Sequence, residues 1–373
     1  MIRGAREVGG CRCLLILLIG LSGGSAAGAQ ERPAAQVLRL AFYHTDLARD
    51  GPGLLLRDLR RGDPQTEAVA AVIAACAPDV LVLSGIDYDA DLAALAALNA
   101  LLEAQGAGYP YLFAAVPNAG RPTGLDLDGN GRRGEARDAQ GYGRFAGQGG
   151  LAVLARWKLS LSRDLSSLLW RDLPDTLFVD HAGRGGEGAR GASVQRLSSS
   201  VHWVVEVATE PPLSLLIFHA TPPVFDGLED RNGRRNHDEA ALWLHLLAGR
   251  LGPVPSGPLV LLGDANLDPH DREGRGEALR ALLAHPALQD PAPGRGVAAC
   301  APGQGGPAPT VDWPVPGPGP LRVSYVLPDR GLQVVAAGVA WPKAGAPLAE
   351  TVQRASRHRL VWAEVRWPPE ARD

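Results

Sequence analysis

Residues 259–266 read Leu-Val-Leu-Leu-Gly-Asp-Ala-Asn, and this stretch carries the clearest structural signal in the chain. Its apolar first half is typical of a buried strand, which ends by presenting Asp264 and Asn266. A second apolar run ends in the same way on His219. Open sheets place reactive groups at the carboxyl ends of their strands. We therefore expect these three residues to converge on one phosphate group, together with His358 at the start of the last predicted strand.

Short aliphatic runs alternate with Ala/Leu-rich helical stretches on both sides of this segment. The alternation is typical of an α/β fold in which stacked sheets carry helices on their outer faces. Strands are predicted at residues 37–43, 79–83, 111–115, 150–155, 201–207, 213–219, 258–263, 321–327, 332–341 and 358–367. Helices are predicted at residues 65–77, 91–105, 237–251 and 276–284, and long Gly/Pro/Asp-rich loops at 116–149, 221–236 and 291–320. Because strand signals occur on both sides of each loop, we expect one domain.

Composition and charge exclude several classes of protein. The 373 residues are 46% hydrophobic and 21% charged, so the chain can bury a sizeable core and is not disordered by composition. The formal net charge is −3, and no basic stripe or tail is present. A mildly acidic chain of this kind is not suited to holding polyanions by long-range charge.

The first 29 residues have the pattern of an export signal. Arg3, Arg6 and Arg12 precede an apolar run at residues 14–21, and small residues follow at 27–29. The alternative is an uncleaved membrane anchor, but the run is shorter than the roughly 20 residues that a bilayer span needs. We expect cleavage before residue 30, a mature domain of residues 30–373, and a periplasmic or secreted location. No later membrane span is predicted.

The cysteine content leaves room for one disulfide at most. After the export signal the chain contains only Cys76 and Cys300. The sequence therefore rules out a disulfide framework and leaves open whether these two residues pair.

Seven segments in a fixed order resemble the endonuclease/exonuclease/phosphatase superfamily with the deoxyribonuclease I-like fold. They cover nearly all of the expected mature domain. In one-letter code the segments are FYHTD at 42–46, PDVLVL at 78–83, GQGGLAVL at 147–154, HATP at 219–222, GDAN at 263–266, SYVLP at 324–328 and SRH at 356–358.

The resemblance implies a fold and an activity. The fold would be a four-layer α/β sandwich, with two mixed β-sheets flanked by helices. The activity would be hydrolysis of phosphodiesters or phosphomonoesters with a divalent metal, Mg²⁺ or Mn²⁺. Specificity in this superfamily lies in the loops, so nucleic acid, a phospholipid headgroup and a sugar phosphate all remain open as substrates. No protein partner is implied.

The resemblance also assigns roles to individual residues. By position, Asp46 corresponds to the acidic residue near the metal, and Tyr142 and Arg144 to contacts with the phosphate. The catalytic set comprises His219 as the general acid, Asp264 and Asn266 as the pair that orients water and stabilises the phosphate, and His358 as the second histidine.

The chain departs from the superfamily pattern at the positions that hold metal. His44 stands where the first strand usually ends in Asn, and Ser84-Gly85 stands where Gln-Glu is usual, so the main metal ligand is missing. Asp87 or Asp89 could replace it by reaching back. The superfamily carboxylates before Tyr325 and before His358 are replaced by Ser324 and Arg357. These losses are expected to weaken a hard-cation site, because hard cations are held by anionic oxygen.

Arg357 could compensate in part for the missing metal charge by pairing with the substrate phosphate. Its guanidinium also disfavours the charged form of the adjacent His358. We therefore expect a mostly neutral His358 at pH 7, which leaves proton donation to His219.

A separate segment resembles part of a calcium-binding loop. Asp126, Asp128, Asn130 and Gly131 have the alternating oxygen ligands and turn glycine of such a loop, but position 12 is Arg137 rather than Glu. Asp138 or Glu135 could close the site. The alternative is a surface turn rich in Asp, Asn and Gly.

Two functions of different class remain at this stage. The first is an exported metal-dependent phosphoesterase. The second is a binding protein on the same fold whose catalysis has decayed, with a phosphate or calcium pocket retained. The two hypotheses separate on whether Asp46, Asp87 and Asp264 come within reach of one metal ion.

Overall fold

The computed structural model describes residues 36–179, 188–270, 273–314 and 316–369. The predicted export signal lies outside these residues. No helix in the described ranges is long and apolar enough to cross a membrane.

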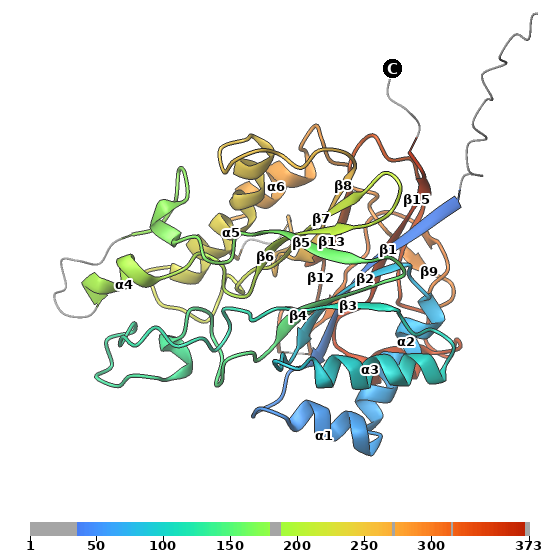
Figure 1. The fold of residues 1–373 in the computed structure, drawn as a ribbon, viewed down its shortest axis with the longest axis horizontal. Coiled ribbons are helices and arrows are strands. Elements are labelled where there is room, and N and C mark those ends of the chain that lie inside the picture. The colour runs from blue at the N-terminus through green and yellow to red at the C-terminus, as the bar shows by residue number, and fades with distance from the viewer. Residues whose placement is uncertain (1–35, 180–187, 271–272, 315, 370–373) are drawn as a thin grey trace, which may run out of the picture. The chain divides into compact units, whose positions relative to one another are not determined.

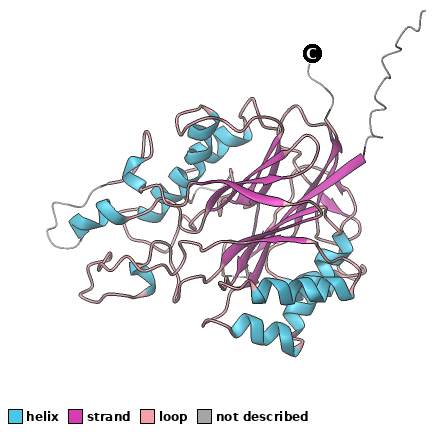
Figure 2. Ribbon diagram, in the orientation of Figure 1, coloured by secondary structure: helices cyan, strands magenta, loops and turns pink. Residues whose placement is uncertain are grey.

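Two β-sheets form the centre of the fold (Figures 1 and 2). The larger sheet has the strand order β10-β9-β14-β15-β1-β2-β4-β3. Its strands are β1 (Gln36–Leu47), β2 (Val80–Ile86), β3 (Tyr111–Phe113), β4 (Gly150–Ala155), β9 (Arg295–Gly296), β10 (Gly303–Gln304), β14 (Val334–Val339) and β15 (Val361–Trp367). The smaller sheet has the order β13-β8-β7-β6-β5. It is built from β5 (Leu159–Asp164), β6 (His202–Val207), β7 (Leu213–His219), β8 (Leu259–Asp264) and β13 (Ser324–Pro328), and a separate pair joins β11 (Val311–Asp312) to β12 (Pro320–Leu321).

Alternation along β1 separates two layers of core. Successive side chains of a strand point to opposite faces of the sheet. Leu38, Leu40 and Phe42 pack in the core between the two sheets. Ala41 and Tyr43 pack in the core on the other face of the larger sheet, against helices. A strand buried on both faces reads as a continuous apolar run rather than an alternating one.

Helices cover the outer face of each sheet, as Figure 1 shows. The larger sheet is covered by α1 (Leu54–Arg61), α2 (Pro64–Cys76), α3 (Ala93–Ala104) and α7 (Ala349–Ala355), and the smaller one by α5 (Arg231–Leu247) and α6 (Glu277–Leu283). The remaining elements are α4 (Gly188–Val194) and the short 3₁₀ helices η1 (Ala136–Asp138) and η2 (Trp170–Asp172). The predicted α/β fold, a four-layer sandwich of two mixed sheets flanked by helices, is confirmed.

Several element boundaries differ from the prediction for physical reasons. The edge strand β5 was not predicted because its side chains are mostly exposed, so it lacks a buried apolar run. Helix α1 and helix α7 are short and were also not predicted. Helix α5 begins at Arg231, inside a segment predicted to be a loop. The first half of this helix was missed because its residues are polar, although much of it is buried.

The buried polar residues of α5 hold neighbouring loops by hydrogen bonds. Glu239 is fully buried, and its carboxylate accepts bonds from the Ser199 backbone N–H at 2.5 Å, the Ser199 hydroxyl at 2.7 Å and the Thr221 N–H at 2.6 Å. These bonds fix the chain on both sides of the β6–β7 pair, because Ser199 precedes β6 and Thr221 follows β7.

We expect the substitution Glu239→Gln to lower the free energy of unfolding by about 1–3 kcal/mol, because one buried N–H would face an amide donor instead of an oxygen. Urea denaturation measures this loss. Glu206→Gln, at the one exposed residue of β6, is the matched control and should change stability by less than about 0.5 kcal/mol. Equal effects of the two substitutions would contradict the role given to Glu239.

Cys76 and Cys300 form a disulfide with their Cα atoms 5.1 Å apart. It joins the last residue of α2 to the segment between β9 and β10. The pairing that the sequence left open is therefore made, and it links the helical layer to the edge of the larger sheet.

Candidate active site

Strand alternation places a set of polar side chains between the two sheets. Leu40 and Phe42 of β1 face the other sheet, so His44, two residues further, faces it as well. In the same way Val82 of β2 is followed by Ser84. His44 and Ser84 are directly paired neighbours in the parallel β1–β2 ladder.

The smaller sheet contributes from the opposite side of the same layer. Ile217 and Leu262 lie in the core between the sheets, and the next residues on that face of β7 and β8 are His219 and Asp264. Asp264 pairs with His219 on one side and with Ser324 of β13 on the other. The apolar layer between the sheets therefore ends in a polar cluster.

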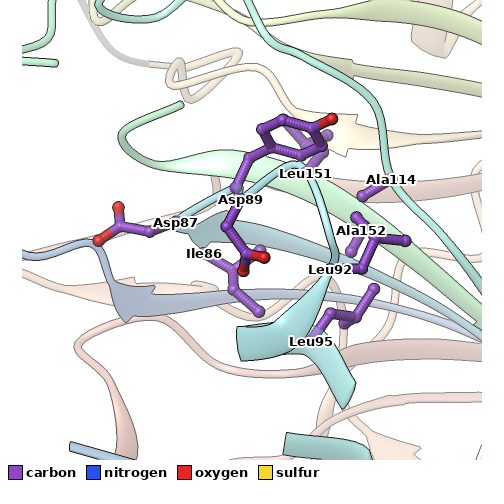
Figure 3. A pocket seen from close by; sticks show the side chains of 9 residues that line it. Ile86, Asp87, Asp89, Leu92, Leu95, Ala114, Leu151 and Ala152 are labelled. Atoms are coloured by element: carbon purple, nitrogen blue, oxygen red, sulfur yellow. The ribbon is translucent and has the colours of Figure 1, made fainter. Parts of the chain in front are cut away.

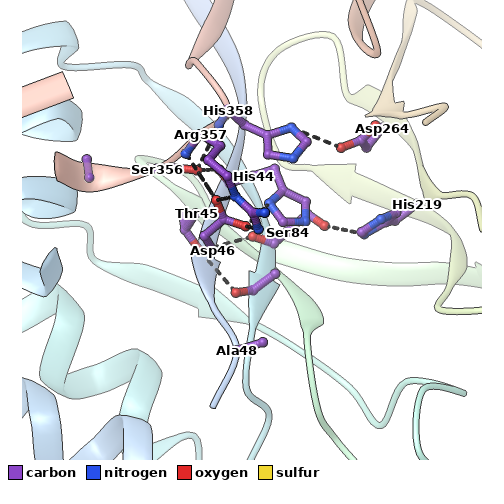
Figure 4. A network of polar contacts seen from close by, with 12 residues as sticks. His44, Thr45, Asp46, Ala48, Ser84, His219, Asp264, Ser356, Arg357 and His358 are labelled. Atoms are coloured by element: carbon purple, nitrogen blue, oxygen red, sulfur yellow. Dashed lines mark hydrogen bonds and ion pairs between the residues drawn. The ribbon is translucent and has the colours of Figure 1, made fainter. Parts of the chain in front are cut away.

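Three histidine rings lie against one another in this cluster (Figure 4). The His44 ring stacks on the His358 ring with centroids 4.1 Å apart, and it meets the His219 ring edge-on at 5.1 Å. His358 lies just before β15, which pairs with β1. Burial lowers the pKa of all three rings, that of His219 to about 3.

Hydrogen bonds fix the orientation of His219. Its Nδ1 lies 2.6 Å from the Ser84 hydroxyl oxygen, and its Nε2 lies 3.0 Å from the Asn266 side-chain nitrogen. That nitrogen also donates to the Ala220 carbonyl at 2.8 Å, so it is the amide donor. His219 Nε2 therefore accepts a bond, and Nδ1 carries the proton that is donated to Ser84.

This neutral state bears on the predicted role of His219. Burial lowers the pKa of His219, which disfavours the charged imidazolium, and the role of general acid stays a prediction. The pKa of His358 is also lowered, which is the direction expected from the sequence. The main cause is burial, followed by the adjacent His44, and Arg357 contributes less.

Asp264 is the most deeply buried carboxylate of the cluster, with no exposed surface. One oxygen accepts a bond from the Asn266 backbone N–H at 2.9 Å. The other oxygen lies 3.5 Å from His358 Nδ1, and neither of these two atoms makes a hydrogen bond within the described chain. Burial raises the pKa of Asp264 to about 7.

Both carboxylate oxygens of Asp46 are bonded to Arg357, and one of them also lies 3.7 Å from His44 Nδ1. One carboxylate oxygen accepts from the Arg357 guanidinium at 3.0 Å, and the other from its backbone N–H at 3.0 Å and from the Ser356 hydroxyl at 3.1 Å. The guanidinium also stacks on Trp313, 4.7 Å from the ring centre. Although burial opposes it, the bond from Arg357 holds the pKa of Asp46 well below its usual range.

Comparisons with known proteins show the family of the chain. Residues 42–358 match the model of the endonuclease/exonuclease/phosphatase family. The chain belongs to this family.

Solved structures with the same fold are distant in sequence. An endonuclease/exonuclease/phosphatase from Beutenbergia cavernae is 21% identical, with a TM-score of 0.53 over 88% of this chain and 71% of that one. The human Nocturnin catalytic domain is 15% identical, with a TM-score of 0.48 over 88% and 94%. A mannosyl-6-phosphatase from Bacteroides thetaiotaomicron is 13% identical, with a TM-score of 0.46 over 88% and 99%. None of the curated proteins compared with the chain matches it significantly.

Asp87, predicted to replace the family's metal glutamate, is bonded to two loops, and its role at a metal stays a prediction. The two carboxylate oxygens of Asp87 accept bonds from the backbone N–H groups of Arg49 and Gly149, each at 2.9 Å. Asp87 therefore braces two loops. It also lines a small recess with Asp89 and apolar side chains, shown in Figure 3, and no member of the histidine cluster lines this recess.

Tyr142 and Arg144, the two residues predicted to contact the phosphate, make no hydrogen bond to the histidine cluster in the described part of the chain. Tyr142 is 68% exposed. Arg144 forms an ion pair with Asp50 on the surface. The structure therefore brings together His219, Asp264, Asn266 and His358, with Asp46 and Arg357 beside them, and leaves Tyr142 and Arg144 outside.

Two members of the cluster were not recognised as site residues from the sequence. His44 was treated only as a departure from the family pattern, and Ser84 likewise. The signal that could have found them is the period of two, since each follows inward-facing residues on its strand.

Three carboxylates of the predicted calcium loop lie close together. Asp126, Asp128 and Asp138 each have an oxygen within 4.8 Å of the others, and Asn130 donates to Asp128 at 3.2 Å. Asp126 and Asp138 also accept bonds from backbone N–H groups of the loop, as an Asp-rich turn would. Calcium binding here stays a prediction.

Calcium at ten times its dissociation constant is expected to raise the melting temperature by about 2–5 °C, and Asp128→Ala is expected to remove this response. A thermal-shift titration with calcium measures it. The control is Asp91→Ala, an exposed carboxylate outside the loop, which should keep the response. If millimolar calcium does not change the melting temperature of the wild-type protein, the segment is a surface turn and not a calcium site.

Proposed function

We propose that this chain is an exported phosphoester hydrolase whose reaction centre is the histidine cluster between the two sheets. The observation that carries the proposal is the convergence of Asp264, Asn266, His219 and His358 at the strand ends, in a family whose members hydrolyse phosphate esters. Reactive groups on rigid strands are held more precisely than groups on loops.

The chain's own residues can each do part of this chemistry. Asp264 has a buried carboxylate oxygen without a hydrogen bond in the described chain, so it can accept one from an attacking water. The Asn266 side-chain nitrogen donates its two hydrogens to the Ala220 carbonyl and to His219 Nε2, so it can donate to a phosphate oxygen only if the phosphate replaces the bond to His219. Asn266 is held in a left-handed backbone conformation with a φ of 50°. His219 holds that side-chain amide in place through its Nε2.

A hard cation such as Mg²⁺ does not fit this centre. The position of the family's glutamate is Gly85, and both oxygens of Asp46 are taken up by Arg357 and Ser356. The structure therefore supports no step of the reaction that passes through a carboxylate-bound magnesium ion.

The same observations favour a second candidate. A family member that has lost its metal carboxylates could bind a phosphate group at Asn266 and His358 without cleaving it. Among the described residues no candidate metal site joins Asp46, Asp87 and Asp264, whose convergence on one metal ion would favour catalysis over binding.

Export is supported by two features. The arginine-led apolar run at the start of the sequence has the form of a signal peptide. The disulfide between Cys76 and Cys300 is of a kind that persists in oxidising compartments and is rare in the cytosol.

An assay on aryl phosphomonoesters and phosphodiesters, with Mg²⁺, Mn²⁺ and Ca²⁺ in turn and with no added metal, tests the hydrolase. Turnover that disappears in Asp264→Ala, purified in parallel, supports the proposal, because a contaminating phosphatase would be unaffected. No turnover of either ester, combined with saturable binding of inorganic phosphate, would favour the binding protein.

A further inference from the structure

The donor atoms at the centre of the cluster are those of a transition-metal site. His44, His219 and Asp264 each have a ligand atom within 4.8 Å of the other two. Two imidazoles and one carboxylate form the donor set of many zinc and iron sites, whereas magnesium sites are built from oxygen.

His44 occupies the space that a side chain at position 85 would need. A Cβ added to Gly85 would lie 2.7 Å from His44 Cε1, closer than such atoms approach, and 3.0 Å from His44 Nε2. Gly85 also has a φ of 67°, which favours glycine. The His44 ring fits in its observed place only because position 85 has no side chain. The imidazole of His44 therefore fills the space beside the position where the family has a glutamate.

Buried polar atoms at this point lack hydrogen bonds. His44 Nδ1, Asp264 Oδ2 and His358 Nδ1 make none within the described chain. A buried polar atom without a hydrogen bond destabilises the folded state. An ion bound to Asp264 Oδ2 would give that oxygen a partner. His44 Nδ1 lies 3.7 Å from Asp46 Oδ1, so its lack of a hydrogen bond is no evidence for an ion beside Asp264.

The surroundings also match those of metal-binding histidines. Such a histidine usually donates its second N–H to a neighbouring group, which fixes the ring and its tautomer. His219 does this through Nδ1 to Ser84 at 2.6 Å, and its Nε2 carries the lone pair. An incoming metal would replace the bond that Nε2 accepts from Asn266.

We propose that His44, His219 and Asp264 bind one divalent transition metal ion of the zinc class, in place of a carboxylate-bound magnesium ion. The inference deepens the proposed function, since it rests on the same centre, but it depends only on the donor atoms. A second grouping, His44 with Asp46 and His358, shares His44 and offers a carboxylate already bound to Arg357. We therefore place the ion on the Asp264 side.

Metal binding without substrate tests this inference, so a failure of binding and a failure of hydrolysis can be told apart. The full chain, without a polyhistidine tag, is stripped with a chelator and titrated with Zn²⁺, Co²⁺ and Mg²⁺ by calorimetry, with Co²⁺ also followed by its visible absorption. We expect one Zn²⁺ or Co²⁺ per chain, bound at least about 100-fold more tightly than Mg²⁺. Equal affinity for Mg²⁺, or no saturable binding of Co²⁺, would overturn the proposal.

Variants then identify the ligands. His44→Asn and Asp264→Asn are each expected to weaken Co²⁺ binding by at least about 10-fold and to change its absorption spectrum. Gly85→Ala removes no donor atom but would displace His44, so it should weaken binding as well. The matched control is His285→Asn, a histidine outside the cluster, which should leave the affinity unchanged. An equal loss in His285→Asn, or no loss in the His44 and Asp264 variants, would reject the site.

Discussion

Replacing Asp264 with asparagine is expected to lower the rate of phosphoester hydrolysis by about 10²–10⁴-fold, the range typical for loss of a group that transfers a proton. Asparagine has nearly the same shape and can still accept the bond from the Asn266 backbone N–H. The substitution therefore removes the carboxylate oxygen that makes no hydrogen bond in the described chain, and leaves the strand end in place. Measuring kcat/KM on the aryl ester that the wild-type protein cleaves gives the ratio.

Asp79→Asn is the matched control for this experiment. Asp79 is a half-buried carboxylate that accepts a bond from the Arg39 backbone N–H at 2.8 Å, just before β2 begins. It lies at the opposite end of β2 from Ser84, so it tests the loss of a similar charge away from the cluster. Activity that is unchanged in Asp264→Asn, or lost equally in Asp79→Asn, would contradict the assignment of Asp264.

The part of the site that could be predicted is the part encoded in single strands. The residues at the ends of β7 and β8 were found because an apolar run followed by His219 or Asp264 is visible in the sequence itself. The position of a residue along a strand also predicts which face of the sheet its side chain occupies, since side chains on one face recur with a period of two. His44 could have been placed in the cluster by the same rule.

The part that could not be predicted depends on pairing between distant strands. Asp46 and Arg357 are 311 residues apart in the sequence, and their contact exists because β1 and β15 are neighbours in the larger sheet. From the sequence, Asp46 was assigned to metal and Arg357 to phosphate. An ion pair between two such groups changes the chemistry of both, and no local pattern signals it.

The course of α5 was mispredicted for a related reason. Its first half contains Arg235, Asn236 and Glu239, which read as a polar loop but are buried and hydrogen-bonded. Amphipathic periodicity detects helices that bury apolar side chains. A helix that buries polar side chains against loops has no such signal, because its partners are backbone groups far away in the sequence.

Loss of the disulfide between Cys76 and Cys300 is expected to have the largest effect on stability. The bridge joins residues 224 positions apart, and cross-linking a loop of that length restricts the unfolded chain strongly. The chain-entropy relation gives about 5 kcal/mol, and measured values for native disulfides are about 2–5 kcal/mol. We therefore expect reduction of the wild-type protein to lower its free energy of unfolding by about 2–5 kcal/mol, measured by urea denaturation with and without dithiothreitol.

The double substitution Cys76→Ser and Cys300→Ser separates the bridge from other effects of the reductant. This variant should be somewhat less stable than the reduced wild-type protein. The additional loss comes from the serine hydroxyl at position 76, because Cys76 is fully buried in the core beside the larger sheet. It should not respond to dithiothreitol. A wild-type protein whose stability is the same in both states would mean that the bridge adds nothing to the fold, and it would remove one of the two supports for export. A protein that loses several kcal/mol on reduction would instead depend on an oxidising compartment for its stability, as an exported protein does.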